Sequence, residues 1–125
     1  MGERILIVDD NPTNLKLVAY LVKANGYEVA TASDAETALV AIREHLPRLI
    51  LMDVQLPGID GLELTRRLKS DPATQQILIV AVTAYAMKGD QDKAIEAGCD
   101  DYITKPIDTR ALPKTLARLL GTEVA

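Results

Sequence analysis

Five strand-like segments alternate with five helix-like segments along the 125 residues, and this strict alternation restricts the possible folds more than any other feature of the sequence. The strand-like segments cover residues 5–8, 28–32, 49–52, 77–82 and 102–104. Continuous aliphatic runs, as in 5–8 and 49–52, are typical of strands buried on both faces. Strands that alternate with helices predict an α/β fold, in which right-handed crossovers place helices on both faces of a parallel sheet. The alternation alone leaves the order of the strands open.

Local signals mark where the helices begin and end. Asn11 is a suitable N-cap for a helix that starts at Pro12, and Gly26 is a typical stop signal. Ser33 and Glu36 predict a capping box at the start of the second helix. The remaining helices are expected near residues 62–70, 88–97 and 108–120.

The composition excludes several classes of protein. Lys and Arg total 14 against 18 Asp and Glu, a net charge of −4, which disfavours binding to DNA. The single cysteine, Cys99, excludes an intrachain disulfide and a cysteine-based zinc site. The apolar run 5–8 is too short for a signal peptide or a membrane span, so we expect a cytoplasmic protein without a membrane partner.

Polar residues follow four of the five expected strands. The first strand ends at Asp9 and Asp10, the third at Asp53, the fourth at Thr83 and the fifth at Lys105. Ligands of open parallel sheets bind beyond the carboxyl ends of the strands. A single aspartate there is often only a helix cap, but several functional groups at one rim indicate a site.

The chemistry of these residues favours a phosphoryl group. Three carboxylates in one crevice repel one another unless cations neutralise them. Asp10 and Asp53 offer the hard oxygen ligands that Mg²⁺ prefers, Lys105 offers a compact positive charge, and Thr83 offers a hydroxyl donor. Such groups steady a phosphoryl group during transfer. Because the chain has no glycine-rich nucleotide-binding motif, we expect the phosphoryl group to come from another molecule and to bond to a carboxylate.

Four segments together resemble the receiver domain of two-component response regulators. They are ILIVDDNPTN, LILMDVQLPGIDGLE, IVAVTAYA and GCDDYITKPI, and they follow the order of that family over nearly the whole chain. The resemblance implies a flavodoxin-like (βα)5 fold, a doubly wound parallel five-stranded sheet with strand order 2-1-3-4-5. Within the family the chain resembles stand-alone DivK-type cell-cycle and polarity regulators, on account of AYAMKGD and its short ends. Residues 1–125 are therefore expected to form a single receiver domain without an output domain.

The resemblance also implies a role for each acidic residue. Asp53 matches the phosphoacceptor, and it is also a Mg²⁺ ligand. Asp10 matches the principal Mg²⁺ ligand, and Asp9 matches an acidic neighbour that acts through water. Gln55 lies where the family contributes a backbone carbonyl to the metal.

Further positions match the groups that contact the phosphoryl group and relay its presence. Thr83, the backbone of Ala84 and the side chain of Lys105 match the phosphoryl contacts. Thr83 and Tyr102 match a switch pair, in which the aromatic ring turns inward as the hydroxyl moves. The Lys105-Pro106 peptide matches a bond that is cis in the family, and proline is the only residue for which the cis form is cheap.

These matches predict a signalling domain rather than an enzyme. A sensor histidine kinase or histidine phosphotransfer protein would supply the phosphoryl group, and a downstream protein would bind the surface of the fourth helix, fifth strand and fifth helix.

Gln55 and Tyr85 are expected to tune the lifetime of the phosphorylated state, Tyr85 by hindering the access of water to the phosphoryl group. The alternative is a pseudo-receiver that binds partners without phosphorylation. A phosphatase of the haloacid-dehalogenase type is disfavoured, because it needs an aspartate at position 55.

Three other features have simpler interpretations. Cys99 is expected to be a small packing residue, since no histidine lies near it in the sequence. His45, the only histidine, is expected in the last turn of a helix, where a partial positive charge suits the helix dipole. The charged stretch 88–93 is expected to be a solvated helix face.

Overall fold

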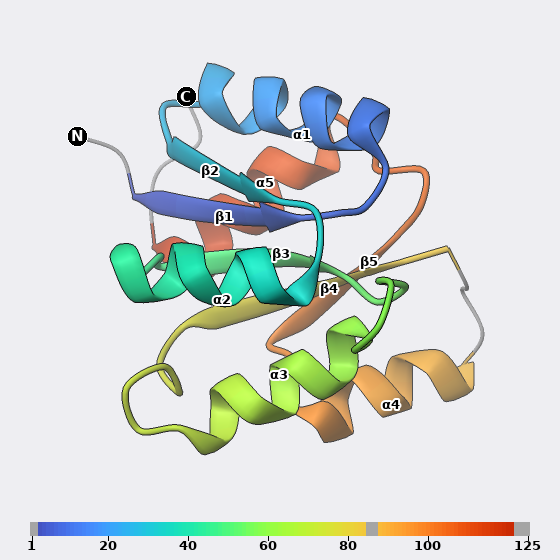
Figure 1. Ribbon diagram of the computed structural model, residues 1–125. Helices are drawn as coiled ribbons and strands as arrows, with labels where there is room; N and C mark the ends of the chain where they lie inside the picture. The colour runs from blue at the N-terminus through green and yellow to red at the C-terminus, as the bar shows by residue number, and fades with distance from the viewer. Residues whose placement is uncertain (1–2, 85–87, 122–125) are drawn as a thin grey trace.

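The computed structural model describes residues 3–84 and 88–121, and its strands and helices alternate strictly (Figure 1). The strands are β1 Arg4–Val8, β2 Glu28–Ala32, β3 Leu49–Asp53, β4 Leu78–Thr83 and β5 Asp101–Thr104. The helices are α1 Pro12–Ala24, α2 Ala35–Glu44, α3 Gly61–Ser70, α4 Lys88–Ala97 and α5 Ala111–Leu120.

All five strands are parallel and form one sheet in the order β2-β1-β3-β4-β5. The register pairs Val8 of β1 with Met52 of β3, Asp53 of β3 with Val82 of β4, and Thr83 of β4 with Thr104 of β5. The sheet confirms the expected α/β class and the flavodoxin-like strand order. It also brings the carboxyl ends of β1, β3, β4 and β5 to one rim.

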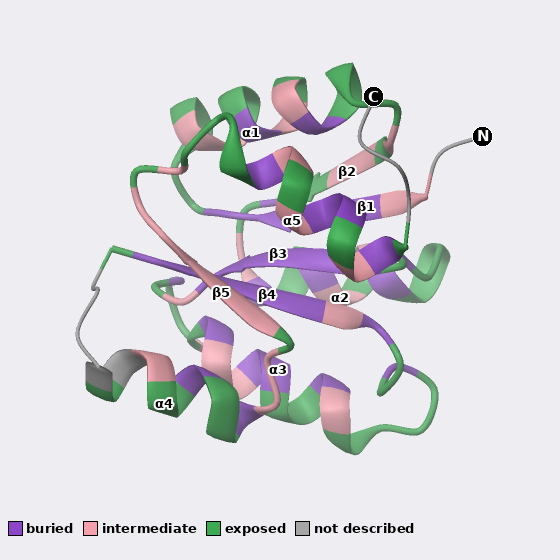
Figure 2. Ribbon diagram, turned by 180° about the vertical axis from the view of Figure 1, so that it is seen from behind, coloured by how far each residue is buried: buried purple, intermediate pink, exposed green. Residues whose placement is uncertain are grey.

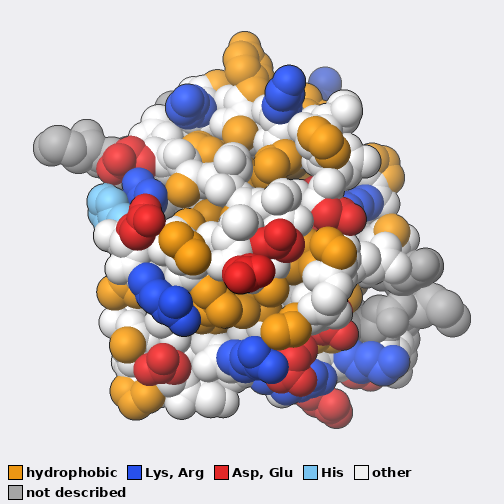
Figure 3. Space-filling view, viewed as in Figure 1, with side chains coloured by type: hydrophobic (Ala, Val, Ile, Leu, Met, Phe, Trp, Pro, Cys, Tyr) orange, Lys and Arg blue, Asp and Glu red, His pale blue; other side chains and the backbone are white. Residues whose placement is uncertain are grey.

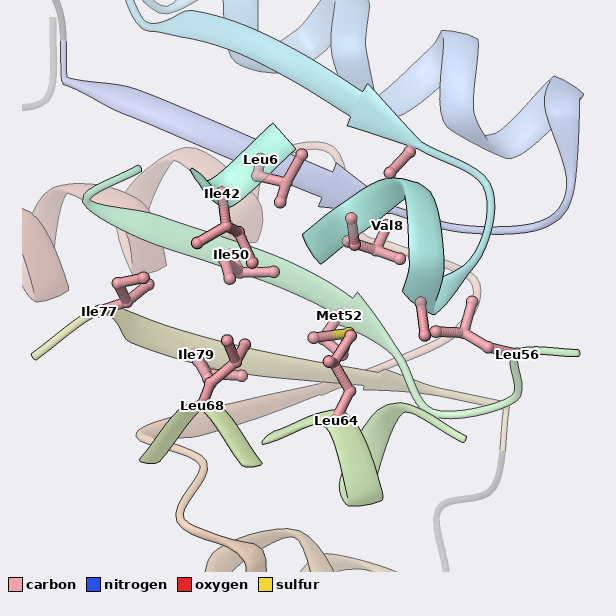
Figure 4. Close-up of a cluster of buried hydrophobic side chains, with 13 residues drawn as sticks. Leu6, Val8, Ile42, Ile50, Met52, Leu56, Leu64, Leu68, Ile77 and Ile79 are labelled. Atoms are coloured by element: carbon pink, nitrogen blue, oxygen red, sulfur yellow. The ribbon is translucent and has the colours of Figure 1, made fainter. Parts of the chain in front are cut away.

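Two hydrophobic clusters lie on opposite faces of the sheet, because successive side chains of a strand point to opposite faces. Leu6, Ile50 and Met52 pack under α2 and α3, where Met52 and Leu64 lie close together (Figure 4). Ile5, Ile7, Leu49 and Leu51 pack under α1 and α5 on the other face. Figure 2 shows the central strands buried almost throughout. The continuous aliphatic runs of the sequence therefore correspond to strands covered on both faces.

The expected start of α1 is confirmed, and that of α2 is corrected by one residue. Asn11 caps α1 by accepting from the backbone N–H groups of Thr13 and Asn14. At α2 the N-cap is Asp34, not Ser33: its carboxylate accepts from the backbone N–H of Thr37 at 2.8 Å, and Thr37 completes the capping box in place of Glu36. The carboxylate of Asp34 occupies the cap position, which leaves Ser33 outside the motif.

The last helix is shorter than expected. It starts at Ala111, three residues after Asp108, whose carboxylate accepts from the backbone N–H groups of Arg110 and Ala111. Gly26 and Gly98 follow the ends of α1 and α4 with positive φ angles of 91° and 106°, as expected of helix stop signals.

The lone cysteine, the lone histidine and the charged stretch 88–93 lie at the surface or against a hydrophobic cluster. Cys99 is half-buried against the α2–α3 cluster, and burial raises the pKa of its thiol, which keeps it in the poorly nucleophilic neutral form. His45 is exposed and is the C-cap of α2, one residue beyond the last turn. Asp92 and Lys93 of α4 are exposed, as expected of a solvated face.

The surface of the described chain carries charges of both signs. On the face seen in Figure 3, acidic and basic side chains are interspersed among exposed apolar ones. Within residues 3–84 and 88–121, none of the helices combines the length and the apolar character needed to cross a membrane.

Candidate functional site

The register of the sheet brings the predicted site residues together from distant parts of the chain. Asp9 directly follows β1 and Asp53 is the last residue of β3, and these strands are neighbours with Val8 opposite Met52. Thr83 ends β4 beside β3, and Lys105 directly follows β5 beside β4. Backbone bonds extend the pairing beyond the strands: the N–H of Lys105 donates to the carbonyl of Thr83 at 2.7 Å.

Three carboxylates form the centre of this rim. Asp9, Asp10 and Asp53 each contribute a carboxylate oxygen, and these oxygens all lie within 4.8 Å of one another. Asp9 and Asp53 are buried, whereas Asp10 is exposed. The cluster is therefore a small acidic notch that opens to solvent on the side of Asp10.

One lysine faces two of these carboxylates. The Nζ of Lys105 lies 3.1 Å from Oδ2 of Asp53 and 3.8 Å from Oδ2 of Asp9. Its side chain is 21% exposed, so solvent screens the interaction less than on an open surface. The ammonium thus offsets part of the negative charge of the notch.

Backbone donors hold the two buried carboxylates in place. Oδ1 of Asp53 accepts from the N–H of Gln55 at 3.0 Å, and Oδ1 of Asp9 accepts from the N–H of Asn11 at 2.9 Å. In each residue the other oxygen, Oδ2, is the one nearer Lys105. One oxygen is therefore fixed by the local turn while the other faces the lysine.

Burial raises the pKa of the Asp53 carboxyl above its ordinary value. The N–H of Gln55 and the ammonium of Lys105 both lower it, and the charge of Asp9 raises it further. Desolvation is the largest of these effects, so the net direction is upward. An ionised Asp53 is consequently stabilised by any additional positive charge in the notch.

The donor set fits a magnesium ion. Mg²⁺ prefers oxygen ligands, uses few protein carboxylates and retains several waters. Asp10 and Asp53 could provide such ligands, and the exposure of Asp10 leaves room for water. Gln55, which was expected to offer its backbone carbonyl, lies in the turn after β3 and is exposed.

The remaining predicted residues surround the notch or flank it in the sheet. Thr83 is buried at the end of β4, Ala84 follows it and is exposed, and the Lys105-Pro106 peptide is cis, as the resemblance implied. Tyr102 is half-buried in β5, in register with Ala81, two positions before Thr83. Tyr85, expected to control water access, lies outside the described residues.

Two residues near the site were not predicted from the sequence to lie there. Lys93 of α4 lines a cavity of about 260 Å³ together with Gln55, Asp60 and Thr83. Gly61, the first residue of α3, lies against the backbone of Asp53. The glycine that directly follows the N-cap residue Asp60 was the available signal, because a helix start seldom needs glycine for its own sake.

Comparison with protein families matches residues 5–117 to the response regulator receiver domain. The polar-differentiation response regulator DivK of Brucella anthropi is 45% identical over 121 residues, which cover 97% of this chain and 98% of that protein. The match thus extends through all the strands that form the notch.

Solved structures give the same result at the level of the fold. The receiver domain of the sensor histidine kinase PA1611 from Pseudomonas aeruginosa, solved with a magnesium ion in its active-site cleft, is 33% identical with a TM-score of 0.88, covering 98% of this chain and 100% of that one. The chemotaxis response regulator CheY4 of Vibrio cholerae is 25% identical with a TM-score of 0.89, covering 95% and 99%.

Proposed function

The chain belongs to the response regulator receiver domain family of two-component systems, and we propose that it accepts a phosphoryl group on Asp53 and signals to protein partners. One observation carries this proposal. A buried carboxylate with a raised pKa lies within reach of two further carboxylates and a lysine at the carboxyl end of a parallel sheet. This combination suits a nucleophile that works beside a divalent cation.

The proposed reaction is phosphoryl transfer from a phosphohistidine. A carboxylate oxygen of Asp53 forms a bond to phosphorus while the N–P bond of the donor breaks, and the electron pair of that bond stays on the imidazole nitrogen. Bound Mg²⁺ would supply charge neutralisation at the phosphoryl oxygens. The N–H of Gln55 orients one carboxylate oxygen, and Lys105 stabilises the negative charge that develops.

The signal is proposed to pass through Thr83 and Tyr102. A phosphoryl group adds negative charge and acceptor oxygens beside the end of β4, which attracts the hydroxyl of Thr83 and the backbone N–H of Ala84. Movement of Thr83 would leave space for the ring of Tyr102 on the adjacent strand. A pair of side chains with two arrangements can convert a local charge into a change of surface.

Two surfaces support exchange with protein partners. An apolar cavity of about 320 Å³ lies beside Lys105, between α1 and Pro106, and could receive an apolar side chain of a histidine kinase or histidine phosphotransfer protein that docks close to Asp53. A second cavity of about 350 Å³, which shares Pro106 and Ile107 with the first, lies between Tyr102 and α5, and Ile95 of α4 is 59% exposed. We propose the α4–β5–α5 surface as the one that a downstream protein reads, in the cytoplasm and without DNA or membrane.

The proposed role is that of a signalling domain and not of an enzyme that turns over free substrates. The test is incubation with a small acyl phosphate and Mg²⁺, followed by mass spectrometry. The wild-type protein should gain one phosphoryl group, and Asp53→Asn should gain none. Asp71→Asn, which changes an exposed aspartate at the end of α3, is the matched control and should behave as the wild type. Undiminished phosphate incorporation in Asp53→Asn, or none in the wild type, would refute the proposal; the second result would leave an interaction module that works without phosphate.

A further inference from the structure

Gly61 lies unusually close to the backbone of Asp53. A Cβ atom built on Gly61 would be 2.2 Å from the carbonyl oxygen of Asp53, 3.0 Å from its carbonyl carbon and 3.0 Å from Cγ of Met52. The first two neighbours are backbone atoms, so no rotation of a side chain could relieve the overlap. Any side chain at position 61 must therefore move α3 or the end of β3.

The close approach to the Asp53 backbone, and not the backbone conformation of residue 61, explains why this position is a glycine. Gly61 does not share the positive φ angles of Gly26, Gly58, Gly98 and Gly121. An added Cβ would meet no atom within 4 Å at Gly26, Gly58, Gly89 or Gly121, and only the side chain of Lys69 at Gly98. Among the glycines within the described part of the chain, Gly61 alone would meet backbone.

Two backbone hydrogen bonds hold Val54, the residue directly after Asp53, from opposite sides. On one side, the N–H of Val54 donates to the carbonyl of Val82 in β4 at 2.9 Å. On the other side, the N–H of Gly61 donates to the carbonyl of Val54, also at 2.9 Å. Between them, Oδ1 of Asp53 accepts from the N–H of Gln55. A displaced α3 would open this turn and change the direction of the Asp53 carboxylate and of the Gln55 carbonyl.

We propose that Gly61 is a positioning residue of the site: its missing side chain lets the start of α3 press on the Asp53 backbone and fix the groups that would face the metal ion and the phosphoryl group. This inference rests on the proposed function, because it assigns Gly61 a part in that same site. It differs from a general packing role, since a packing role predicts lost stability without a specific loss of metal affinity.

The test compares Gly61→Ala with two matched glycine variants. Gly61→Ala should weaken Mg²⁺ binding, measured by calorimetry, by about 10- to 100-fold, as is usual when the support of a metal ligand is lost. The amide NMR signals of Asp53 and Gln55 should shift in the metal-free protein, and acyl phosphate uptake should slow. Gly89→Ala, in open space within α4, should bind Mg²⁺ like the wild type. Gly58→Ala places a side chain at a positive φ in the same loop, where it meets no other atom. This variant therefore separates the effect of backbone strain from the effect of steric overlap.

A destabilised variant with an intact site separates positioning from stability. Ile42→Val removes one methylene from the α2–α3 cluster and should lower the Tm without a change in Mg²⁺ affinity. If Gly61→Ala unfolds in part, the titration is repeated with trimethylamine oxide, which favours the compact state. Wild-type Mg²⁺ affinity in folded Gly61→Ala, or failure to fold even with the osmolyte, would overturn the inference. A wild-type protein that takes up no phosphate would instead overturn the proposed function.

Discussion

The Nζ atom of Lys105 lies 3.1 Å from Oδ2 of Asp53, although 52 positions separate the two residues in the chain. The carboxylate side chain is 3% exposed and the lysine side chain 21% exposed, so the pair is largely shielded from solvent. The ammonium partly neutralises the notch where we expect a divalent cation to bind. Lys105 should therefore oppose metal binding and assist phosphoryl transfer, and these two effects can be measured separately.

Replacement of Lys105 by methionine should change the two quantities in opposite directions. Removal of the positive charge leaves Asp9 and Asp53 with more negative potential, so Lys105→Met should bind Mg²⁺ more tightly in calorimetry. Loss of a donor aimed at the developing charge should slow acyl phosphate uptake by about 10²- to 10³-fold. Lys23→Met, which removes an exposed lysine from the last turn of α1, is the control and should change neither quantity. Weaker Mg²⁺ binding in Lys105→Met would contradict this assignment.

The raised pKa of Asp53 predicts a specific dependence of stability on pH. The folded protein holds a proton on Asp53 more tightly than the unfolded chain does, because burial disfavours the carboxylate. The free energy of unfolding of the metal-free protein should therefore fall as the pH rises from the ordinary pKa through the raised one. Asp53→Asn removes this loss, so it should raise the Tm at pH 7, by about 4 °C for each kcal/mol relieved in a domain of this size.

The same experiment has a built-in control in acid. Below the ordinary pKa of an aspartate, both states of the wild type are protonated at this position, and the advantage of Asp53→Asn should disappear. Mg²⁺ affinity of the wild type should likewise decline as the pH falls through the raised pKa, because protons then compete for Asp53. A Tm of Asp53→Asn at or below that of the wild type at pH 7 would show that burial does not disfavour the carboxylate.

The capping box of α2 predicts that Asp34, and not Ser33, stabilises the helix. Asp34→Ala should lower the Tm because the N–H of Thr37 loses its acceptor, whereas Ser33→Ala should leave the Tm within error. Backbone and side-chain hydrogen bonds from Thr37 lower the pKa of Asp34, so its contribution is present above the ordinary pKa and is lost as the pH falls through the lowered one. The two Tm curves should converge in strong acid, and an equal effect of both substitutions would be evidence against the assigned cap.

The sequence was sufficient to predict the sheet and the residues of the notch. Buried parallel strands are continuous aliphatic runs, and polar residues that follow them must meet at one rim whatever the connecting helices contain. Asp9, Asp53, Thr83 and Lys105 could therefore be named before any distances were known. The strand order needed the family resemblance, because alternation alone fits more than one arrangement.

Contacts that depend on how elements pack could not be predicted. Ser33 and Asp34 are both favourable N-cap residues, and the sequence does not show at which of the two the helix begins. The closeness of Gly61 to Asp53 depends on where α3 lies over the end of β3. The hydrogen-bond partners of Lys69 also depend on how the elements pack, because they lie in the loop before β4 and in the turn before β5.

Lys69 joins α3 to both of those segments at the amino end of the sheet. Its Nζ donates to the carbonyl of Ile77 at 2.8 Å and lies 3.0 Å from Oδ2 of Asp100. The same Oδ2 accepts from the N–H of Ile79 at 2.8 Å, and the stem of Lys69 passes Gly98, where an added Cβ would lie 2.9 Å from its Cγ. The side chain of Lys69 is 21% exposed and that of Asp100 is 30% exposed, so the interaction is partly shielded from water.

Removal of the amine should therefore cost more than removal of a surface charge. Lys69→Met keeps the apolar stem but leaves the carbonyl of Ile77 and the carboxylate of Asp100 without their cation, so urea denaturation should show a loss of about 1–3 kcal/mol. Arg66→Met, which breaks a 3.9 Å pair with Glu63 on the exposed face of the same helix, should change the stability by less than about 0.5 kcal/mol. In a double-mutant cycle with Asp100→Asn, the two changes should fall short of additivity by about 0.5 kcal/mol or more, because each removes the same ion pair. Strict additivity would mean that Lys69 acts only through the backbone carbonyls of Gln75 and Ile77 and that its pair with Asp100 contributes nothing.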